Sequence, residues 1–146
     1  MRKILSIVIS MIVILALLVV FLAATSLSSV NDEVKALYKQ LKIEVKSEGY
    51  KANFFPISGK RSVFFNRFLP LAMEESEHFN GNALDIFVLD VNEDQRINDE
   101  DVKIIYDILD TKIVEDKGAV GQYVDSASFL GKQMVHFDNR GTRARW

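Results

Sequence analysis

Three side chains of this protein could together hold a metal ion: His78, Asp85 and His136, a set that includes both histidines of the chain. Asp85 lies early in an apolar segment, residues 83–89, where a carboxylate is costly unless it is paired or bound to a metal. His136 lies in a second apolar segment. Two histidines and one carboxylate leave one coordination position open, which is how catalytic zinc is commonly held. The pattern therefore predicts a zinc site, and the alternative is a pair of structural or exposed histidines.

Three short motifs surround these residues. The segment SEHFNGNALDI, which begins at Ser76, fits the pattern S-x-H-x-x-G-x-A-x-D, and the C-terminal segment VHFDNRGTRARW fits V-H-x-D-x-R-G-x-R-x-R-W. Upstream, SGKRS followed by Asn66 resembles an S-G-Y-R-S…N element. Together, in this order, the motifs resemble the zinc D-Ala-D-Ala carboxypeptidase and murein endopeptidase family, which shares its fold with the Hedgehog signalling domain. The resemblance covers residues 57–146.

The resemblance implies a zinc-dependent peptidase that hydrolyses amide bonds in the stem peptides of peptidoglycan, as a carboxypeptidase or as an endopeptidase. It implies His78, Asp85 and His136 as the zinc ligands. It also implies Arg61 as the cation that stabilises the substrate oxyanion or carboxylate, and Ser76 as the residue that shapes the turn carrying His78. Bound zinc lowers the pKa of its water from 15.7 to ~7, and a guanidinium stays charged beside it.

The general base is where the chain departs from the family pattern. The family places a Glu or His just before the last ligand, whereas this chain has Gln133, Met134 and Val135, none of which titrates. Alternate residues of a strand point to the same side, so Asp138 shares a side with His136. We predict Asp138 either as the general base or as the partner that orients His136. The alternative is that Asp138 only orients a backbone turn.

An acidic loop follows the segment that carries Asp85. Residues 90–101, DVNEDQRINDED, resemble the calcium loop of an EF-hand or dockerin, with hard oxygen ligands at alternate positions. Gln95 stands where Gly normally permits a sharp turn, so a solvated acidic turn is the alternative. Five strand residues separate Asp85 from Asp90 by ~17 Å, so we expect calcium to be structural and not part of a two-metal centre. The predicted calcium ligands are Asp90, Asn92, Asp94, the carbonyl of Arg96, Asn98 and Asp101.

The N-terminal segment predicts where the protein works. Residues 4–24 carry no charge, and as a helix they are long enough to cross a hydrocarbon core of ~30 Å. The small residues of AATSLSS could instead carry a signal-peptide cleavage site. Arg2 and Lys3 should stay cytoplasmic, which places the rest of the chain in the periplasm or on the extracytoplasmic face. We therefore assign residues 1–28 to a signal peptide or membrane anchor and residues 29–146 to the exported domain.

Composition and periodicity bound the partners and the fold. The chain has no Cys, which excludes disulfides and a lipoprotein anchor, and its net charge of −2 argues against a nucleic-acid partner. Mixed helices and short strands predict an α+β domain: a small antiparallel sheet with flanking helices, Hedgehog/DD-peptidase-like by resemblance, preceded by a hydrophobic helix. The predicted helices are 30–50, 62–75 and 99–110, and the predicted strands are 52–59, 83–89, 118–124 and 132–138.

Two further functions stay open. The absent Glu or His beside the last ligand is compatible with a non-catalytic cell-wall-binding or calcium-responsive module on the same fold. A calcium-binding adaptor would require that both histidines bind no zinc.

Overall fold

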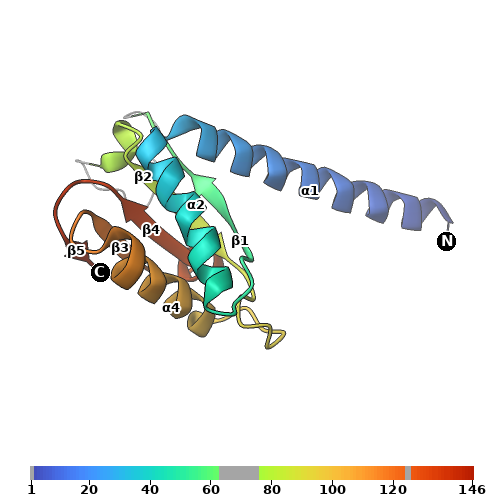
Figure 1. The fold of residues 1–146 in the computed structure, drawn as a ribbon. Helices are drawn as coiled ribbons and strands as arrows, with labels where there is room; N and C mark the ends of the chain where they lie inside the picture. The colour runs from blue at the N-terminus through green and yellow to red at the C-terminus, as the bar shows by residue number, and fades with distance from the viewer. Residues whose placement is uncertain (1, 63–75, 124–125) are drawn as a thin grey trace.

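The apolar N-terminal segment and the amphipathic segment after it form two separate helices. In the computed structural model, which describes residues 2–62, 76–123 and 126–146, α1 spans Arg2–Ser29 and α2 spans Asp32–Ser47. Figure 1 shows α1 extending away from the rest of the molecule, with only its C-terminal end against the domain. By length and composition α1 is able to cross a membrane, and a signal sequence meets the same test.

Helix α2 forms where the periodicity of the sequence predicts it. The side chain of Asn31 caps the helix by accepting a hydrogen bond from the Val34 amide at 2.8 Å. Gly49, with φ of +87°, follows the last turn in the left-handed conformation that glycine adopts without strain. The buried stripe consists of Val34, Tyr38, Leu41 and Val45.

Five strands form one sheet in the order β1-β2-β4-β3-β5. The predicted strands are confirmed, each a little shorter than the apolar run that predicted it. The bounds are β1 Phe54–Ser58, β2 Ala83–Val88, β3 Ala119–Gln122, β4 Met134–Asp138 and β5 Ala144–Arg145.

The sheet is mixed, so the prediction of a purely antiparallel sheet is wrong at one edge. Strands β1, β2, β4 and β3 are antiparallel neighbours, but β5 pairs with β3 in parallel. The cause is topological. After β4 the chain reverses, and both sides of β4 are already occupied by β2 and β3. The last strand therefore pairs with the free edge of β3, where it runs in the same direction.

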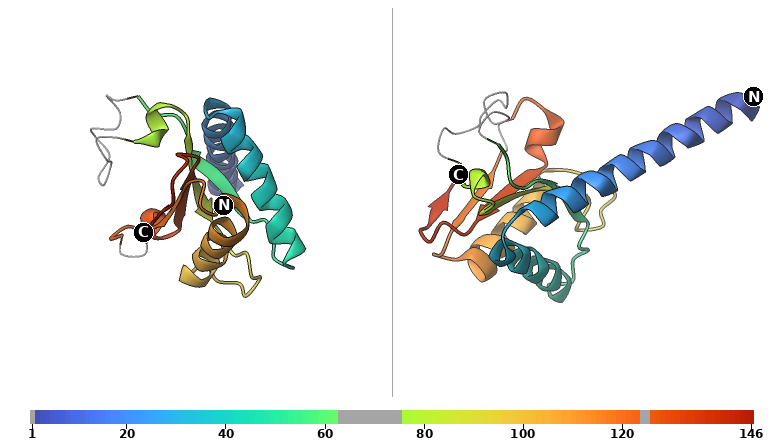
Figure 2. Two further views of the ribbon diagram at one scale, coloured as in Figure 1. Left: turned by 60° about the vertical axis from the view of Figure 1, so that its left-hand side comes forward. Right: turned by 90° about the horizontal axis from the view of Figure 1, so that it is seen from above.

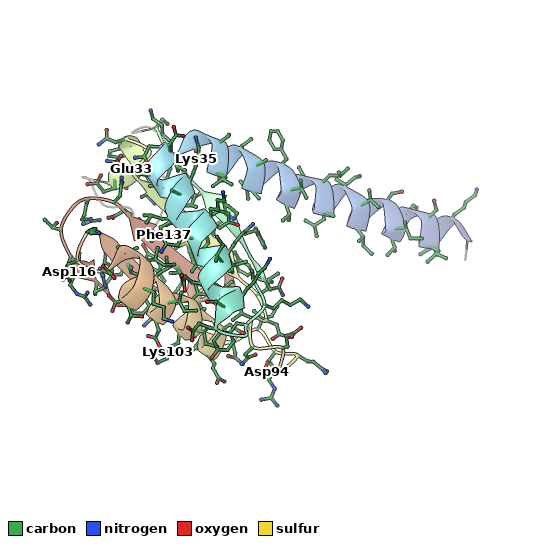
Figure 3. The ribbon with its side chains drawn as sticks, in the orientation of Figure 1. Glu33, Lys35, Asp94, Lys103, Asp116 and Phe137 are labelled. Carbon is green, nitrogen blue, oxygen red and sulfur yellow. The ribbon has the colours of Figure 1, made fainter. Side chains whose placement is uncertain are left out.

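Helices cover one face of the sheet, and the other face carries the polar residues of interest. Helices α2 and α4 (Asp99–Ile108) lie over the same face, and α4 continues as one π-helical segment, η2 (Leu109–Val114). Figure 3 shows Phe137 of β4 pointing into this layer, where it is fully buried. Alternate residues of β2 (Leu84, Ile86 and Val88) join the same core. The residues between them, including Asp85, therefore face away from the helices.

Two short elements complete the described part of the chain. A 3₁₀ turn, η1 (Glu77–Phe79), precedes β2, and α5 (Phe129–Lys132) precedes β4. The helix predicted over residues 62–75 lies almost entirely outside the described residues.

Candidate metal centre

The structure brings together the three residues that the sequence predicts as metal ligands. His78 comes from η1, Asp85 from β2 and His136 from β4, and all three are buried. Asp85 and His136 are directly opposite each other across the β2–β4 ladder, so their side chains leave the same face of the sheet as neighbours. Within the described ranges, this is the one group of three or more His, Cys, Asp or Glu residues whose ligand atoms converge, all within 4.8 Å of one another.

The spacing of the ligand atoms fits a single tetrahedral ion. His78 Nε2 lies 3.3 Å from both His136 Nδ1 and Asp85 Oδ1, and His136 Nδ1 lies 2.8 Å from Asp85 Oδ1. Two atoms bound to tetrahedral zinc at ~2.0–2.1 Å lie about 3.3 Å apart. Two of the three separations match this value, and the third, between His136 Nδ1 and Asp85 Oδ1, is the shorter distance of a direct hydrogen bond. The group can therefore hold a metal ion, and its two nitrogens and one oxygen suit zinc among several divalent ions.

His78 is held so that one defined nitrogen faces the centre. Its Nδ1 lies 2.6 Å from the carbonyl oxygen of Gly59. A carbonyl can only accept, so Nδ1 carries the proton and Nε2 keeps a lone pair for a metal. Ser76 caps the turn, and its hydroxyl accepts a hydrogen bond from the His78 amide at 3.4 Å. This contact agrees with the role that the resemblance implies for Ser76.

His136 is oriented in the same way by Asp138. Its Nε2 lies 3.2 Å from Asp138 Oδ2, so the proton sits on Nε2 and Nδ1 faces Asp85. The fully buried carboxylate of Asp138 also accepts hydrogen bonds from the Ala119 amide at 2.9 Å and from Arg140 Nη2 at 2.6 Å. Of the two roles predicted for Asp138, these contacts favour the one that orients His136.

The charges of the centre follow from its burial and its hydrogen bonds. Burial raises the pKa of Asp85, but the hydrogen bond with His136 and the proximity of His78 together outweigh burial and lower that pKa below its ordinary value. Burial lowers the pKa of His136, yet hydrogen bonds to Asp138 and Asp85 raise it to about 8. The metal-free centre thus holds an ionised Asp85 beside a His136 that is protonated at neutral pH. A metal ion must displace that proton in order to bind.

Arg61 lies beside the ligands and pairs with one of them. Its Nη2 donates to Asp85 Oδ2 at 2.5 Å, and its Nε donates to the Ser58 hydroxyl at 2.8 Å. Because Arg61 occupies Oδ2, the other oxygen of Asp85 is the one that faces the two histidines. A guanidinium has five N–H groups, so Arg61 keeps donors for a bound substrate while it holds Asp85 in place.

Two aromatic residues that sequence reasoning did not assign to the site lie next to it. The ring centroids of Trp146 and His136 lie 5.3 Å apart. Trp146 is 42% exposed. It occupies the space above Gly121, where a Cβ atom would lie 2.2 Å from the indole. Tyr123 directly follows β3, and burial and the charge of Asp85 raise the pKa of its phenol. The Trp that ends the C-terminal motif was the one signal in the sequence for this neighbour of the site. Its position beside His136 depends on the pairing of β5 with β3.

The acidic loop follows the C-terminal end of β2, whereas the turn that carries His78 precedes its N-terminal end, as the sequence predicts. Asp90 accepts hydrogen bonds from the amides of Asp94 and Gln95, and the side chains of Asn92 and Asp94 bond to backbone amides within the loop. Gln95 takes a φ of +67°, the conformation that Gly normally supplies at that position. The loop therefore forms a tight turn in which side-chain oxygen atoms accept hydrogen bonds from backbone amides of the same loop.

Two of the remaining predicted calcium ligands, Asn98 and Asp101, stabilise the start of α4. Asn98 caps the helix and accepts from the Glu100 amide at 2.8 Å. Asp101, fully buried, accepts from the amides of Val91 at 2.8 Å and Asn98 at 3.0 Å. The carbonyl of Arg96 belongs to the same loop. No three carboxylates of the loop converge within the described structure, so calcium binding stays a prediction.

Comparison of this chain with protein-family models, with curated proteins and with solved structures found no match. The family resemblance carried by the three motifs therefore stays a prediction, and the site is argued from its own geometry.

Proposed function

We propose that this protein is an exported, zinc-dependent peptidase that hydrolyses amide bonds in the stem peptides of peptidoglycan. The observation that carries the metal part of the proposal is the convergence of His78, Asp85 and His136, each oriented by its own outer partner. Outer partners of this kind fix the tautomer of a ligating histidine and raise its basicity. The substrate class rests on the three sequence motifs.

Each residue of the site has a separate role in such a reaction. A zinc ion held by the three ligands would supply a Lewis acid and a water of pKa ~7. Arg61, always charged and adjacent to Asp85, is suited to stabilise negative charge that develops on the carbonyl oxygen of the substrate. Asp138 keeps His136 in the tautomer that can ligate. The exposed face of Trp146 offers an apolar wall beside the centre for the substrate.

Structural calcium in the acidic loop belongs to the same proposal. The support is the run of oxygen-bearing side chains at alternate positions, together with the left-handed conformation of Gln95. Calcium binding would require Asp90 and Asp94 to exchange backbone amides for the ion. Calorimetric titration of the metal-free protein with Ca²⁺, with Asp94→Ala as the control, tests this directly.

The central test measures zinc and turnover in one pair of variants. The full chain is purified in detergent, its metal content is measured by mass spectrometry, and its products from purified muropeptides are identified. Asp85→Asn removes a ligand charge and should abolish zinc retention and cleavage. Asp116→Asn makes the same chemical change at an exposed position and should leave both unchanged. A wild-type protein that never retains zinc overturns the proposal.

A non-catalytic zinc module that binds the cell wall is the second candidate. The observation in its favour concerns the positions beside the last ligand: Gln133, Met134 and Val135 do not titrate, and Asp138 is bonded to His136 and Arg140. This candidate predicts zinc retention and saturable binding of muropeptides without any cleavage, in the same assays.

A further inference from the structure

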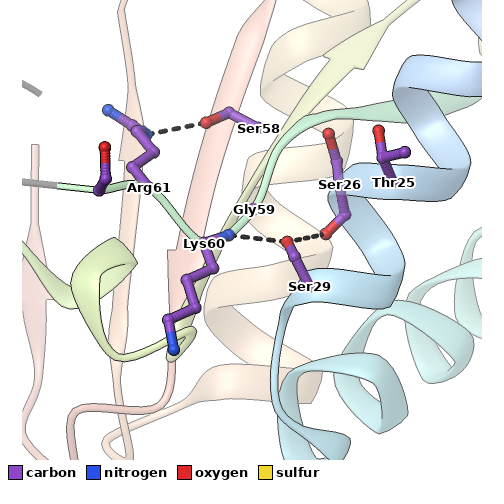
Figure 4. A pocket seen from close by; sticks show the side chains of 8 residues that line it. Thr25, Ser26, Ser29, Ser58, Gly59, Lys60 and Arg61 are labelled. Carbon is purple, nitrogen blue, oxygen red and sulfur yellow. Dashed lines mark hydrogen bonds between the residues drawn. The ribbon is translucent and has the colours of Figure 1, made fainter. Parts of the chain in front are cut away.

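The last turn of α1 packs directly against the segment that follows β1. A Cβ atom on Gly59 would lie 2.1 Å from the carbonyl oxygen of Ser26 and 2.4 Å from the hydroxyl of Ser29, so only glycine allows this approach. The Ser29 hydroxyl accepts a hydrogen bond from the Lys60 amide at 2.9 Å and donates one to the Ser26 carbonyl at 2.7 Å (Figure 4). Ser26 is buried, unlike the residues of α1 that precede it. The end of the apolar helix is therefore part of the domain.

The segment held by α1 is the one that supports the metal centre. The carbonyl of Gly59 fixes Nδ1 of His78 at 2.6 Å, and the amide of Arg61 donates to the carbonyl of His78 at 3.0 Å. Arg61 in turn binds Asp85. One backbone segment thus connects the last turn of α1 to two of the three ligands.

A second set of contacts joins the same helix end to the other side of the His78 turn. Gly81, three residues after His78, approaches the Ser29 carbonyl so closely that a Cβ atom would lie 3.1 Å from it. Asn31, just after α1, donates its amide to the Gly81 carbonyl at 2.9 Å and its side-chain nitrogen to Asn82 Oδ1 at 2.8 Å. The turn that carries His78 is therefore clamped between the 59–61 segment and the junction after α1.

We infer that the last turn of α1 is a positioning element of the metal centre, and that α1 is retained as the anchor that holds this centre at the outer face of the membrane. The inference rests on the proposed function and narrows its substrate class to stem peptides close to the bilayer, on lipid-linked precursors or newly added strands. Cleavage within AATSLSS (residues 23–29) would cut α1 in the turn that carries Ser26 and Ser29 and would separate this turn from the rest of the helix. The pocket at this junction is lined by serine and threonine residues together with Gly59, Lys60 and Arg61, a composition suited to the headgroup layer where a span of residues 4–24 ends.

Zinc affinity of the full chain in detergent micelles, measured by competition with a chelator, tests the positioning role. Ser29→Ala removes the acceptor for the Lys60 amide, and Gly59→Ala forces the helix end away. Ser28→Ala is the matched control, because this exposed hydroxyl donates to the carbonyl of Thr25 in its own helix and has no other hydrogen bond to the described residues. We expect about tenfold or greater loss of zinc affinity for Gly59→Ala, a smaller loss for Ser29→Ala and none for Ser28→Ala.

The possible outcomes separate this inference from the proposed function. Wild-type affinity in both Ser29→Ala and Gly59→Ala overturns the inference while the zinc site stands. A lower melting temperature of the metal-free protein without a change in zinc affinity shows a purely structural role and overturns it as well. A wild-type chain that binds no zinc instead overturns the proposed function.

The narrowed substrate class is tested by placing enzyme and substrate in the same or in different vesicles. The full chain is reconstituted either with a lipid-linked stem peptide in one bilayer or in vesicles mixed with vesicles that carry that substrate, and a soluble muropeptide with the same stem serves as reference. We expect at least tenfold faster cleavage in the shared bilayer. Equal rates for the shared-bilayer and soluble substrates overturn the membrane-proximal assignment. Cleavage of neither substrate, by a chain that retains zinc, instead favours the non-catalytic module.

Discussion

Asp138→Asn should weaken zinc binding through the tautomer of His136. Asp138 Oδ2 lies 3.2 Å from His136 Nε2, and because a carboxylate only accepts, it keeps the proton there. An Asn side chain offers an N–H₂ group as well as an oxygen. When that group faces the ring, the proton moves to Nδ1, which can then no longer ligate. Loss of such a partner typically costs 10–100-fold in metal affinity, or about 1.4–2.7 kcal/mol.

The same substitution also disturbs a buried ion pair, so a control must separate the two effects. Asp138 also accepts hydrogen bonds from the Ala119 amide and from the guanidinium and backbone amide of Arg140, and weakening them should cost about 1–3 kcal/mol of folding stability. Arg140→Gln breaks the same pair while it leaves the contact with His136 in place. We expect Arg140→Gln to lower the unfolding free energy of the metal-free protein but to keep zinc affinity within about threefold of wild type.

Chelator competition gives the zinc affinity, and urea unfolding of the metal-free proteins gives the stability. The reasoning is refuted if Asp138→Asn binds zinc as tightly as wild type, or if Arg140→Gln loses as much affinity as Asp138→Asn. A third outcome is equally informative. Wild-type zinc affinity with abolished cleavage in Asp138→Asn would assign the general-base role to this carboxylate.

Four further predictions follow from individual contacts. In the metal-free protein the pKa of His136 is about 8, above its ordinary value of 6.5. The protonated ring therefore stabilises the fold fully below pH 6.5, and this contribution is lost as the pH rises through 8. Urea unfolding at pH 6 and at pH 9 measures the difference. Zinc competes with that proton, so affinity should fall about tenfold per unit below pH 8, measured by chelator competition. Gln95→Gly should raise the unfolding free energy by about 0.5–1 kcal/mol. Glycine adopts the left-handed φ of this position without steric strain, and this gain exceeds the entropy that the more flexible unfolded chain adds. Gly121→Ala should displace the indole of Trp146 and lower the melting temperature, whereas Gly141→Ala meets no atom within 4 Å and strains only its own backbone.

The sequence predicted the ligand set from local signals around each residue and from the resemblance of its motifs to a zinc peptidase family. A carboxylate in an apolar strand needs a partner, and strand alternation determines which residues share its face. Asp85 and His136 satisfy both conditions, and their direct pairing across β2 and β4 turns two separate sequence signals into one site. Helix α2 was predictable for the same reason, since its cap at Asn31 and its buried stripe lie within seventeen residues of chain.

The parts that the sequence did not predict depend on contacts between distant segments. Strand β5 has two residues, too few to show any periodicity, and only its pairing with β3 brings Trp146 to His136. The pairing of Arg61 with Asp85 likewise requires the tertiary structure, because a motif places Arg61 upstream without showing what it contacts. The close approach of Ser26 to Gly59 has no sequence signal other than the glycine itself.

The choice between a peptidase and a binding module depends on whether a group at the site can accept the proton of the attacking water. A general base works best when its pKa lies near the operating pH. Burial raises the pKa of Asp138, but hydrogen bonds from His136 and Arg140 lower it well below the ordinary value of a carboxyl group, so Asp138 is a weak base that is already committed to a ligand. A peptidase built on this centre would then need its proton acceptor from another group, such as a carboxylate of the bound stem peptide. Cleavage that depends on a free carboxylate in the substrate, and stops when that carboxylate is amidated, would support this substrate-assisted route and favour the peptidase over the module.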